Sequence, residues 1–389
     1  MKALRFLIPV VLLIAAVGFT AGADAPAIGQ PGSLLEPYGL IDAALRASTN
    51  ADPSGDIYFG ASQGLFNGSR WGLRGTEDLG GGFKAIYALE GGVILPVGVI
   101  DQQGQLFGRQ AWVGLKSDYG TLTFGRQYGT FSDAIGAGDV FGTGHGNLGN
   151  GSATNYSSSD GVNFFFAQQM GFRWDNSLKY DGSFSGVAVG VMAATENIPG
   201  GSVTTDGFID KNAMISGKLG YNSKDLPVSG AVGVQYEADA TYNHHIALGG
   251  GLKYALDATD AVYLFYIHSE FDAGFVRISP NNSEISTGGK GRKDDIVNLA
   301  ANYYVMPSLN VIASFYFDYG TYVFQNSDDG QRYSGLLVAD YYLSKDFDVY
   351  LGGWYTQFID SFLQTADGGN QFKGYSSVFS VIMGTRFRF

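Results

Sequence analysis

Four histidines are the first candidates for chemistry in this 389-residue chain, because imidazole can act as a general base or a metal ligand. They are His145, His244, His245 and His268. His244 and His245 are adjacent, and adjacent side chains of a strand point to opposite faces, so they cannot easily share one metal ion. A hydrolase would need a serine and an orienting polar group to converge on a histidine. His268 lies at alternate positions with Tyr266 and Glu270, and we interpret it as part of a strand's inward polar face.

Two other chemical signals are equally weak. The run from Gly80 to Gly82 has no strand-to-helix setting, so it indicates a tight turn and not a phosphate loop. The chain contains no cysteine, which excludes disulfides and thiolate metal sites. We therefore predict no metal, no cofactor and no enzymatic activity.

Charged residues, in contrast, follow a pattern. Asp42 and Arg46 lie at even positions, while Ile41 and Leu45 lie at odd positions. In a strand this places the charged and the apolar side chains on opposite faces. The same alternation places five more basic residues on the face opposite to their apolar neighbours: Arg70, Arg74, Lys84, Arg173 and Lys179. Arg109 is ambiguous, because Ala111 and Val113 share its parity.

The elements that carry these residues belong to an exported chain. Lys2 and Arg5 precede an apolar run, and Ala21–Ala23 offers a cleavage site, so we predict a cleaved signal peptide at 1–23. The alternative, a membrane anchor, needs about twenty apolar residues and a stop-transfer flank. Cleavage would leave 22 basic against 36 acidic residues, a net charge of −14, which argues against nucleic acid as a partner.

Alternating strands dominate the rest. From Leu309 to Gly320 every odd position is apolar or aromatic, and most even positions are polar or small. The C-terminal sequence GTRFRF places Phe387 and Phe389 on one face and its two arginines on the other. Val378 and Ile382 are exceptions, since they fall on the polar face. Glycine at 58 residues, aromatics at 14% and charged residues at only 15% suit strands that face lipid.

The connections between strands alternate in length. Short ones are predicted at 117–120, 180–182, 257–260, 306–308 and 344–346, and long ones at 48–68, 131–161, 272–291 and 360–373. Tight turns at one end and long loops at the other are typical of an outer-membrane barrel. We predict an all-β transmembrane antiparallel barrel of about sixteen strands over 37–389, after a polar lead at 24–36, with the last strand closing against the first. A soluble β-sandwich is the alternative.

Three stretches carry a family resemblance: SRWGLRGTEDLGGG at 69–82, RQAWVGL at 109–115, and RWDNSLKY at 173–180. With YGLID at 38–42 and the terminal phenylalanine, they resemble the general porins of Gram-negative bacteria, particularly the trimeric sixteen-stranded porins of beta-proteobacteria. The resemblance implies an outer-membrane homotrimer whose water-filled channels pass small hydrophilic solutes and ions. It also implies that the third long loop, 131–161, folds into the lumen.

A pore constriction follows from parity and resemblance together. We expect its basic wall to comprise Arg46, Arg74, Lys84, Arg109 and Arg173, and its loop acids to be Asp133 and Asp139. The inward placement of Arg109 rests on the resemblance alone. The family's usual acidic motif at the loop tip is not evident, so we predict a weak preference for anions.

Two further roles rest on the resemblance. Arg126 shares the outward parity of Leu122 and Phe124, where related porins contact a neighbouring subunit, and Asp101 is the candidate partner. Phe387 and Phe389 resemble the signal that the barrel-assembly machinery binds. A substrate-specific channel, or a surface barrel that acts as an adhesin through its loops, remains an alternative function.

Overall fold

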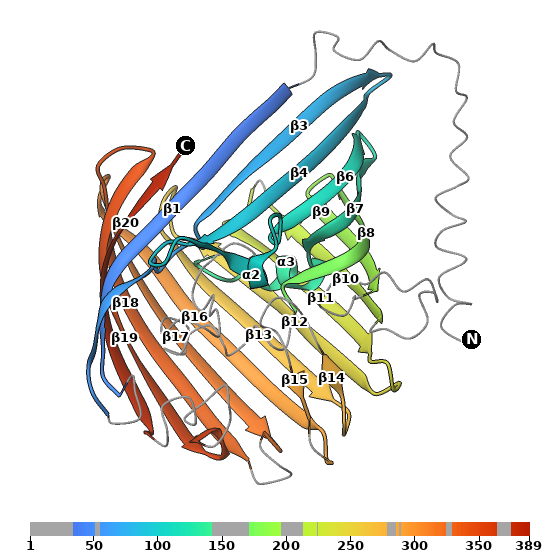
Figure 1. The fold of residues 1–389 in the computed structure, drawn as a ribbon. Coiled ribbons are helices and arrows are strands. Elements are labelled where there is room, and N and C mark those ends of the chain that lie inside the picture. The colour runs from blue at the N-terminus through green and yellow to red at the C-terminus, as the bar shows by residue number, and fades with distance from the viewer. Residues whose placement is uncertain are drawn as a thin grey trace.

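The chain forms one closed antiparallel β-barrel, seen in the computed structural model of Figure 1. The structure describes residues 34–50, 55–141, 171–195, 213–223, 225–277, 285–287, 289–323, 329–363 and 375–389. The predicted signal peptide and most of the predicted third loop lie outside these ranges. No helix among the described residues is long and apolar enough to cross a membrane.

Sixteen strand positions make up the wall. They are occupied by β1 (Leu34–Ser48), β2 (Tyr58–Gln63) with β3 (Arg70–Gly80), β4 (Phe83–Ile94), β6 (Gln110–Ser117), β7 (Gly120–Tyr128), β8 (Arg173–Phe184), β9 (Val187–Thr195), β10 (Ala213–Asn222), β11 (Val228–Ala238), β12 (His244–Ala255), β13 (Ala261–Phe271), β16 (Arg292–Met306), β17 (Leu309–Thr321), β18 (Gly330–Tyr342), β19 (Phe347–Asp360) and β20 (Ser377–Arg388). Smaller elements are β5 (Val99–Ile100), α2 (Asp101–Gly104), α3 (Thr130–Gly136), β14 (Val276–Arg277), β15 (Ile285–Ser286) and η1 (Ser361–Leu363).

The first strand closes the barrel. Residues Leu40–Ser48 of β1 pair with β20, the last strand. On the other side of β1, Leu34–Leu40 pair with β3 and Ala43–Ser48 pair with β2, so β2 and β3 share one position in the wall. No open edge is left at this seam, as a wall in hydrocarbon requires. The predicted barrel and its closure are confirmed, although β1 begins at Leu34, three residues inside the predicted polar lead.

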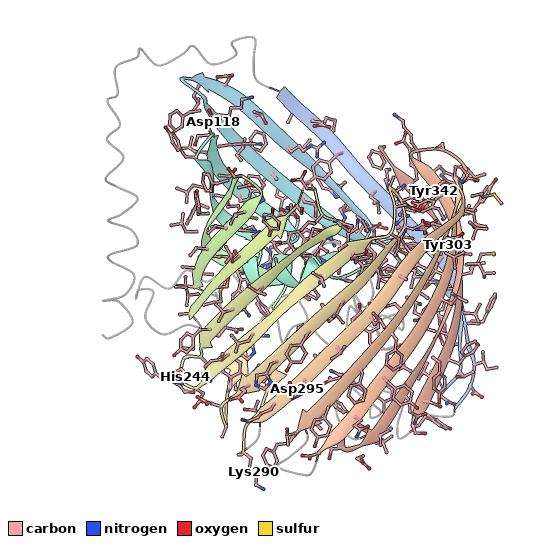
Figure 2. All side chains as sticks on the ribbon, turned by 180° about the vertical axis from the view of Figure 1, so that it is seen from behind. Asp118, His244, Lys290, Asp295, Tyr303 and Tyr342 are labelled. Carbon is pink, nitrogen blue, oxygen red and sulfur yellow. The ribbon has the colours of Figure 1, made fainter. Side chains whose placement is uncertain are left out.

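The two ends of the barrel differ as expected. Asp118, Tyr303 and Tyr342 lie at the end where strands are joined by short turns, which we call the turn end (Figure 2). His244 and Lys290 lie at the opposite, loop end (Figure 2).

Two predicted connections were wrong. Residues 180–182 lie inside β8, where Asp181 pairs with Gly190 of β9, and the turn is formed by Ser185 and Gly186. Both turn residues have positive φ, 50° and 87°, as a two-residue hairpin turn of the I′ type demands, and glycine adopts this conformation at little cost. The predicted loop 48–68 contains β2, because Tyr58–Gln63 pair with β1.

The side chains alternate as predicted, but the inside of the barrel is not uniformly polar. On β17, Ile312 and Tyr316 point inward and are buried, whereas Phe315 points outward and is about half exposed. The inner face of β12–β20 carries a cluster of buried apolar residues: Ala247, Phe265, Ile267, Ile296, Ile312, Leu336, Val338, Trp354 and Ile382. Segments folded into the barrel cover it with Leu65, Phe66, Phe131 and Ile135. The hydrophobic core therefore lies inside the barrel, against one wall.

Candidate pore constriction

Helix α3 begins the predicted third loop and lies against the inner wall. It contacts β9 to β13 and lies within the barrel outline (Figure 1). Glycines in the wall allow the close approach: a Cβ added to Gly251 would lie 2.1 Å from the backbone nitrogen of Gly138, and one added to Gly249 would lie 2.8 Å from Ile135. Any larger residue would displace the helix. The part of the predicted loop that the structure describes therefore folds inward.

Asp133 ties α3 to the wall. Its Oδ2 atom lies 2.7 Å from Nζ of Lys179 on β8 and 3.0 Å from Nζ of Lys218 on β10. Asp181 completes the group, 2.8 Å from Lys218 and 3.4 Å from Lys179. Burial alone would raise the pKa of the Asp133 carboxyl, but the two ammonium groups lower it below its usual value. The predicted loop acid is thus an ionised tether that two lysines neutralise.

Asp139, the second predicted loop acid, has a different environment. It is buried just beyond α3, and its carboxylate accepts a hydrogen bond of 3.1 Å from the backbone N–H of Phe141. In the described part of the chain no lysine or arginine forms an ion pair with it. Burial raises the pKa of Asp139 to about 7, and the backbone hydrogen bond only partly opposes this. Asp139 is therefore suited to a neutral, docked loop and not to an exposed negative charge.

Three arginines meet on the inside of β3–β8. Arg109 Nε donates to Glu90 at 2.8 Å, and its Nη2 donates to the hydroxyl of Tyr128 at 2.9 Å. Arg173 Nη2 donates to the same hydroxyl at 3.1 Å, and Arg70 lies 3.9 Å from Glu90. We call these five residues the arginine cluster.

The arginine cluster carries a net positive charge, because three guanidinium groups face one carboxylate. Tyr38 also binds this carboxylate, with its hydroxyl 2.9 Å from Glu90 Oε2. The side chain of Arg109 is only 1% exposed, and Arg173 is also buried. Such charges act on a solute through the field they project, which is stronger in a low-dielectric wall than in bulk water.

The other predicted basic residues are not members of this cluster. Arg74 is bound to Glu36 by two hydrogen bonds, both of these side chains are more than half exposed, and its guanidinium lies over the ring of Tyr38. Lys84 is exposed, two residues beyond the turn that joins β3 to β4. Arg46 is buried on the inner face of β1, with its guanidinium 5.0 Å from the ring centre of Tyr58. The predicted wall is therefore divided among three places.

Arg126 and Asp101, which were predicted to pair across a subunit interface, contact other residues within the single chain. Arg126 forms an ion pair with Asp175 and donates to the carbonyl of Gly108 at 2.7 Å, which buries its side chain. Asp101 accepts hydrogen bonds from the backbone and side-chain amides of Gln102. Contact between Arg126 and Asp101 across subunits stays a prediction.

The C-terminal strand has the predicted facing. Phe387 and Phe389 are exposed on the outer face, while Arg386 is buried inside with Asp340 and Asp348 as ion partners. The exceptional residue Ile382 belongs to the inner apolar cluster, so it fits a core that the sequence pattern did not reveal.

The histidines form no metal site: no group of three His, Asp or Glu side chains in the described ranges is placed to hold an ion. His245 is buried between Glu237 and Ser269, whereas His244 contacts Asp272 outside. The inward placement of His268 was wrong. Its neighbours Tyr266 and Glu270 are exposed on the outer face, because the inward positions of β13 are Phe265, Ile267 and Ser269. His145 lies outside the described residues.

Sequence reasoning missed several residues of these clusters, notably Glu90, Tyr128, Lys218 and Asp181. Glu90 shares the inward parity of Lys84, which was a usable signal. Arg70 had the correct parity but was not included in the predicted basic wall. Lys218 could be recognised only once the position of Asp133 was known.

Comparison with known proteins agrees with this architecture. The sequence model of the Gram-negative porin family matches residues 12–360. The chain therefore belongs to the Gram-negative porin family, whose members are outer-membrane β-barrels without enzymatic activity. The predicted resemblance, fold class and outer-membrane location are confirmed.

The chain is 36% identical over 215 residues to an outer membrane porin protein of Bordetella pertussis, and 29% identical over 228 residues to outer membrane porin protein 32 of Delftia acidovorans. These matches cover 51% and 55% of this chain but only 49% and 62% of the two relatives. Among solved structures, it resembles an anion-selective porin from Comamonas acidovorans, with a TM-score of 0.69, 21% identity, and coverage of 92% of this chain and all of the other. A trimer form of OmpT from Vibrio cholerae gives a TM-score of 0.60 at 13% identity, covering 92% of this chain and all of the other.

Proposed function

We propose that this protein forms a water-filled channel in the outer membrane for passive diffusion of small hydrophilic solutes and ions, with a preference for anions. The arginine cluster on the inner face of a closed barrel is the observation that carries the proposal. Passage through such a channel depends on its width and on the charge of its wall, and needs no cofactor.

The anion preference follows from the position of the charges. The chain as a whole is acidic, at −12, but exposed charges more than about 8–10 Å from the passage are screened at physiological salt. The two predicted loop acids do not cancel the arginines, since Asp133 is neutralised by lysines and Asp139 is buried. The similar porin from Comamonas acidovorans is described as anion-selective, which supports the same property here.

Ion selectivity in planar bilayers tests the proposal. Replacing Arg70, Arg109 and Arg173 with Gln should shift the reversal potential in a salt gradient toward cations. Lys84→Gln is the control, because it removes an exposed positive charge beside the turn that joins β3 to β4, away from the cluster. Wild-type protein that is folded but never conducts would refute the channel. Equal shifts in both variants would refute the assignment of selectivity to the arginine cluster.

We propose a homotrimer as the assembled form. The family membership supports it, as does the trimer form recorded for the similar OmpT. Sedimentation in mild detergent would test it, and a stable wild-type monomer would contradict it. Arg126→Ala should weaken the trimer if this residue also contacts a neighbouring subunit, as predicted with Asp101.

We propose that Phe387 and Phe389 form the signal that delivers the chain to the barrel-assembly machinery by strand addition. Their exposure on the outer face of the last strand supports this role. Deleting Phe389 should lower outer-membrane levels and leave refolding into detergent nearly unchanged. Equal losses in both settings would show that the residue matters only for barrel stability.

A further inference from the structure

An inward turn at residues 64–69 interrupts the second position of the wall. It joins β2 to β3, which both pair with β1, so the wall stays continuous while the turn folds into the barrel. Leu65 and Phe66, the apolar residues of the inward turn, are buried in the core inside the barrel. The chain thus places two large apolar side chains in the interior without opening the wall.

Asp42 of β1 organises this inward turn. Its Oδ2 atom accepts hydrogen bonds from the backbone N–H groups of Phe66 at 3.0 Å and Asn67 at 2.7 Å. Its Oδ1 atom accepts one from the hydroxyl of Tyr350 at 2.7 Å. A Cβ added to Gly64 would lie 1.6 Å from the same carboxylate, so the turn fits only a glycine there. A buried carboxylate with several donors holds the backbone in one conformation.

Arg386 of the last strand covers the turn from the other side. Its guanidinium lies 4.3 Å from the ring centre of Phe66 and donates to Asn67 Oδ1 at 3.1 Å. Asp340 and Asp348 hold the guanidinium in place through ion pairs. The Arg386 cation therefore holds one face of the Phe66 ring. The Tyr350 ring packs edge-on against Phe66, with 5.0 Å between the two ring centres.

Phe66 reaches the third loop. Its ring centre lies 5.9 Å from that of Phe141, which follows α3 and Asp139. The described part of the third loop is thus held at two places: α3 docks on the glycines of β11 and β12, and Phe141 contacts the inward turn. These supports come from distant parts of the wall.

We propose that the inward turn is a second support for the third loop and that Phe66 positions the constriction. This inference rests on the proposed channel function. Removing the Phe66 ring would free Phe141, so that the segment that follows α3 would no longer be fixed by both supports and the channel width would vary. Phe66 is a positioning residue here, since it acts through Phe141.

Single-channel recording of Phe66→Ala tests this role. We expect a conductance above the wild-type distribution and greater open-channel noise. Phe59→Ala is the matched control, because Phe59 lies on β2 but is 74% exposed. A heat-modifiable band on gels establishes that each variant is folded. Folded Phe66→Ala with the conductance and noise of Phe59→Ala would overturn the proposal.

Chemical bridging gives a second measurement that does not depend on current. The chain has no native cysteine, so Phe66→Cys with Phe141→Cys introduces the only two thiols. A short bifunctional thiol reagent should bridge them in folded protein and restore low noise to the double variant. Absence of bridging in folded protein would overturn the contact. If wild-type protein fails to conduct, the proposed channel function is refuted, but the bridging experiment still tests the contact between Phe66 and Phe141.

Discussion

The two halves of the barrel wall look alike from outside and differ inside. Toward β3–β10 the inner face carries paired charges, such as Arg109 with Glu90 and Lys218 with Asp133. Toward β12–β20 it carries a large apolar cluster, with side chains such as Ile296 and Ile312, covered by segments folded into the lumen. Buried ion pairs such as Arg332 with Asp318 also lie on this side. Outward residues of both halves are largely apolar and exposed.

The difference shows how a barrel can hold a loop and still offer charges to a solute. An apolar inner wall is stabilised only if another apolar surface covers it and excludes water. Helix α3 and the inward turn provide that cover. A charged inner wall is costly unless its groups are paired, so its arginines and lysines are cross-linked by acids and tyrosines. Helix α3 joins the two, with Asp133 on the charged side and Ile135 on the apolar side.

The largest expected loss comes from a buried ion pair on the β12–β20 side. Arg332 and Asp318 are both fully buried, on neighbouring strands. Arg332→Ala should lower the free energy of unfolding by about 3–5 kcal/mol, because the Asp318 carboxylate would be left uncompensated. Arg74→Ala removes an exposed pair and should change stability little. Denaturant unfolding from lipid vesicles measures both, and comparable losses would contradict this contrast.

A smaller loss is expected where α3 meets the wall. Gly251→Ala should destabilise the docked helix by about 1–3 kcal/mol, because the new Cβ would overlap the backbone of Gly138. Gly335→Ala is the control, since a Cβ there meets open space. Unfolding measurements should separate the two variants. Identical stabilities would show that α3 does not depend on the glycine surface.

A third effect is a pH dependence from Asp139. Its pKa in the folded chain, about 7, lies above the usual value near 4, so the fold favours the neutral acid. Its contribution to stability is therefore fully present below about pH 4 and is lost as the pH rises through 7. Asp139→Asn should reduce the fall in unfolding temperature between pH 5 and pH 8.

Asp133→Asn provides a comparison, because the pKa of Asp133 is shifted in the opposite direction from that of Asp139. The pKa of Asp133 is lowered, so its stabilising contribution is present above its usual pKa and is lost only as the pH falls through its lower folded value. Replacing it should leave the change between pH 5 and pH 8 as in the wild type. A wild-type pH profile for Asp139→Asn would contradict the assignment to that residue.

Much of the architecture could be predicted because period two is a local property. The alternation at Leu309–Gly320 and in the final GTRFRF was enough to identify strands with one face to lipid. The number of strands came from counting such segments, and closure followed because backbone polar groups in hydrocarbon must all be paired. The exceptions were instructive: Ile382 broke the polar inner face because it belongs to a core inside the barrel.

Parity specifies the face on which a side chain lies, and only tertiary structure decides the height at which it lies and the residue it meets. Arg70 and Arg74 share an inward parity, yet Arg70 lies beside Glu90 while Arg74 pairs with the exposed Glu36. Strand register and the inward fold of α3 determine these meetings, because they bring together residues far apart in sequence, such as Asp133 and Lys218. The amino-acid sequence thus determined a lipid-facing barrel, whereas three-dimensional packing decided which charges form its candidate constriction.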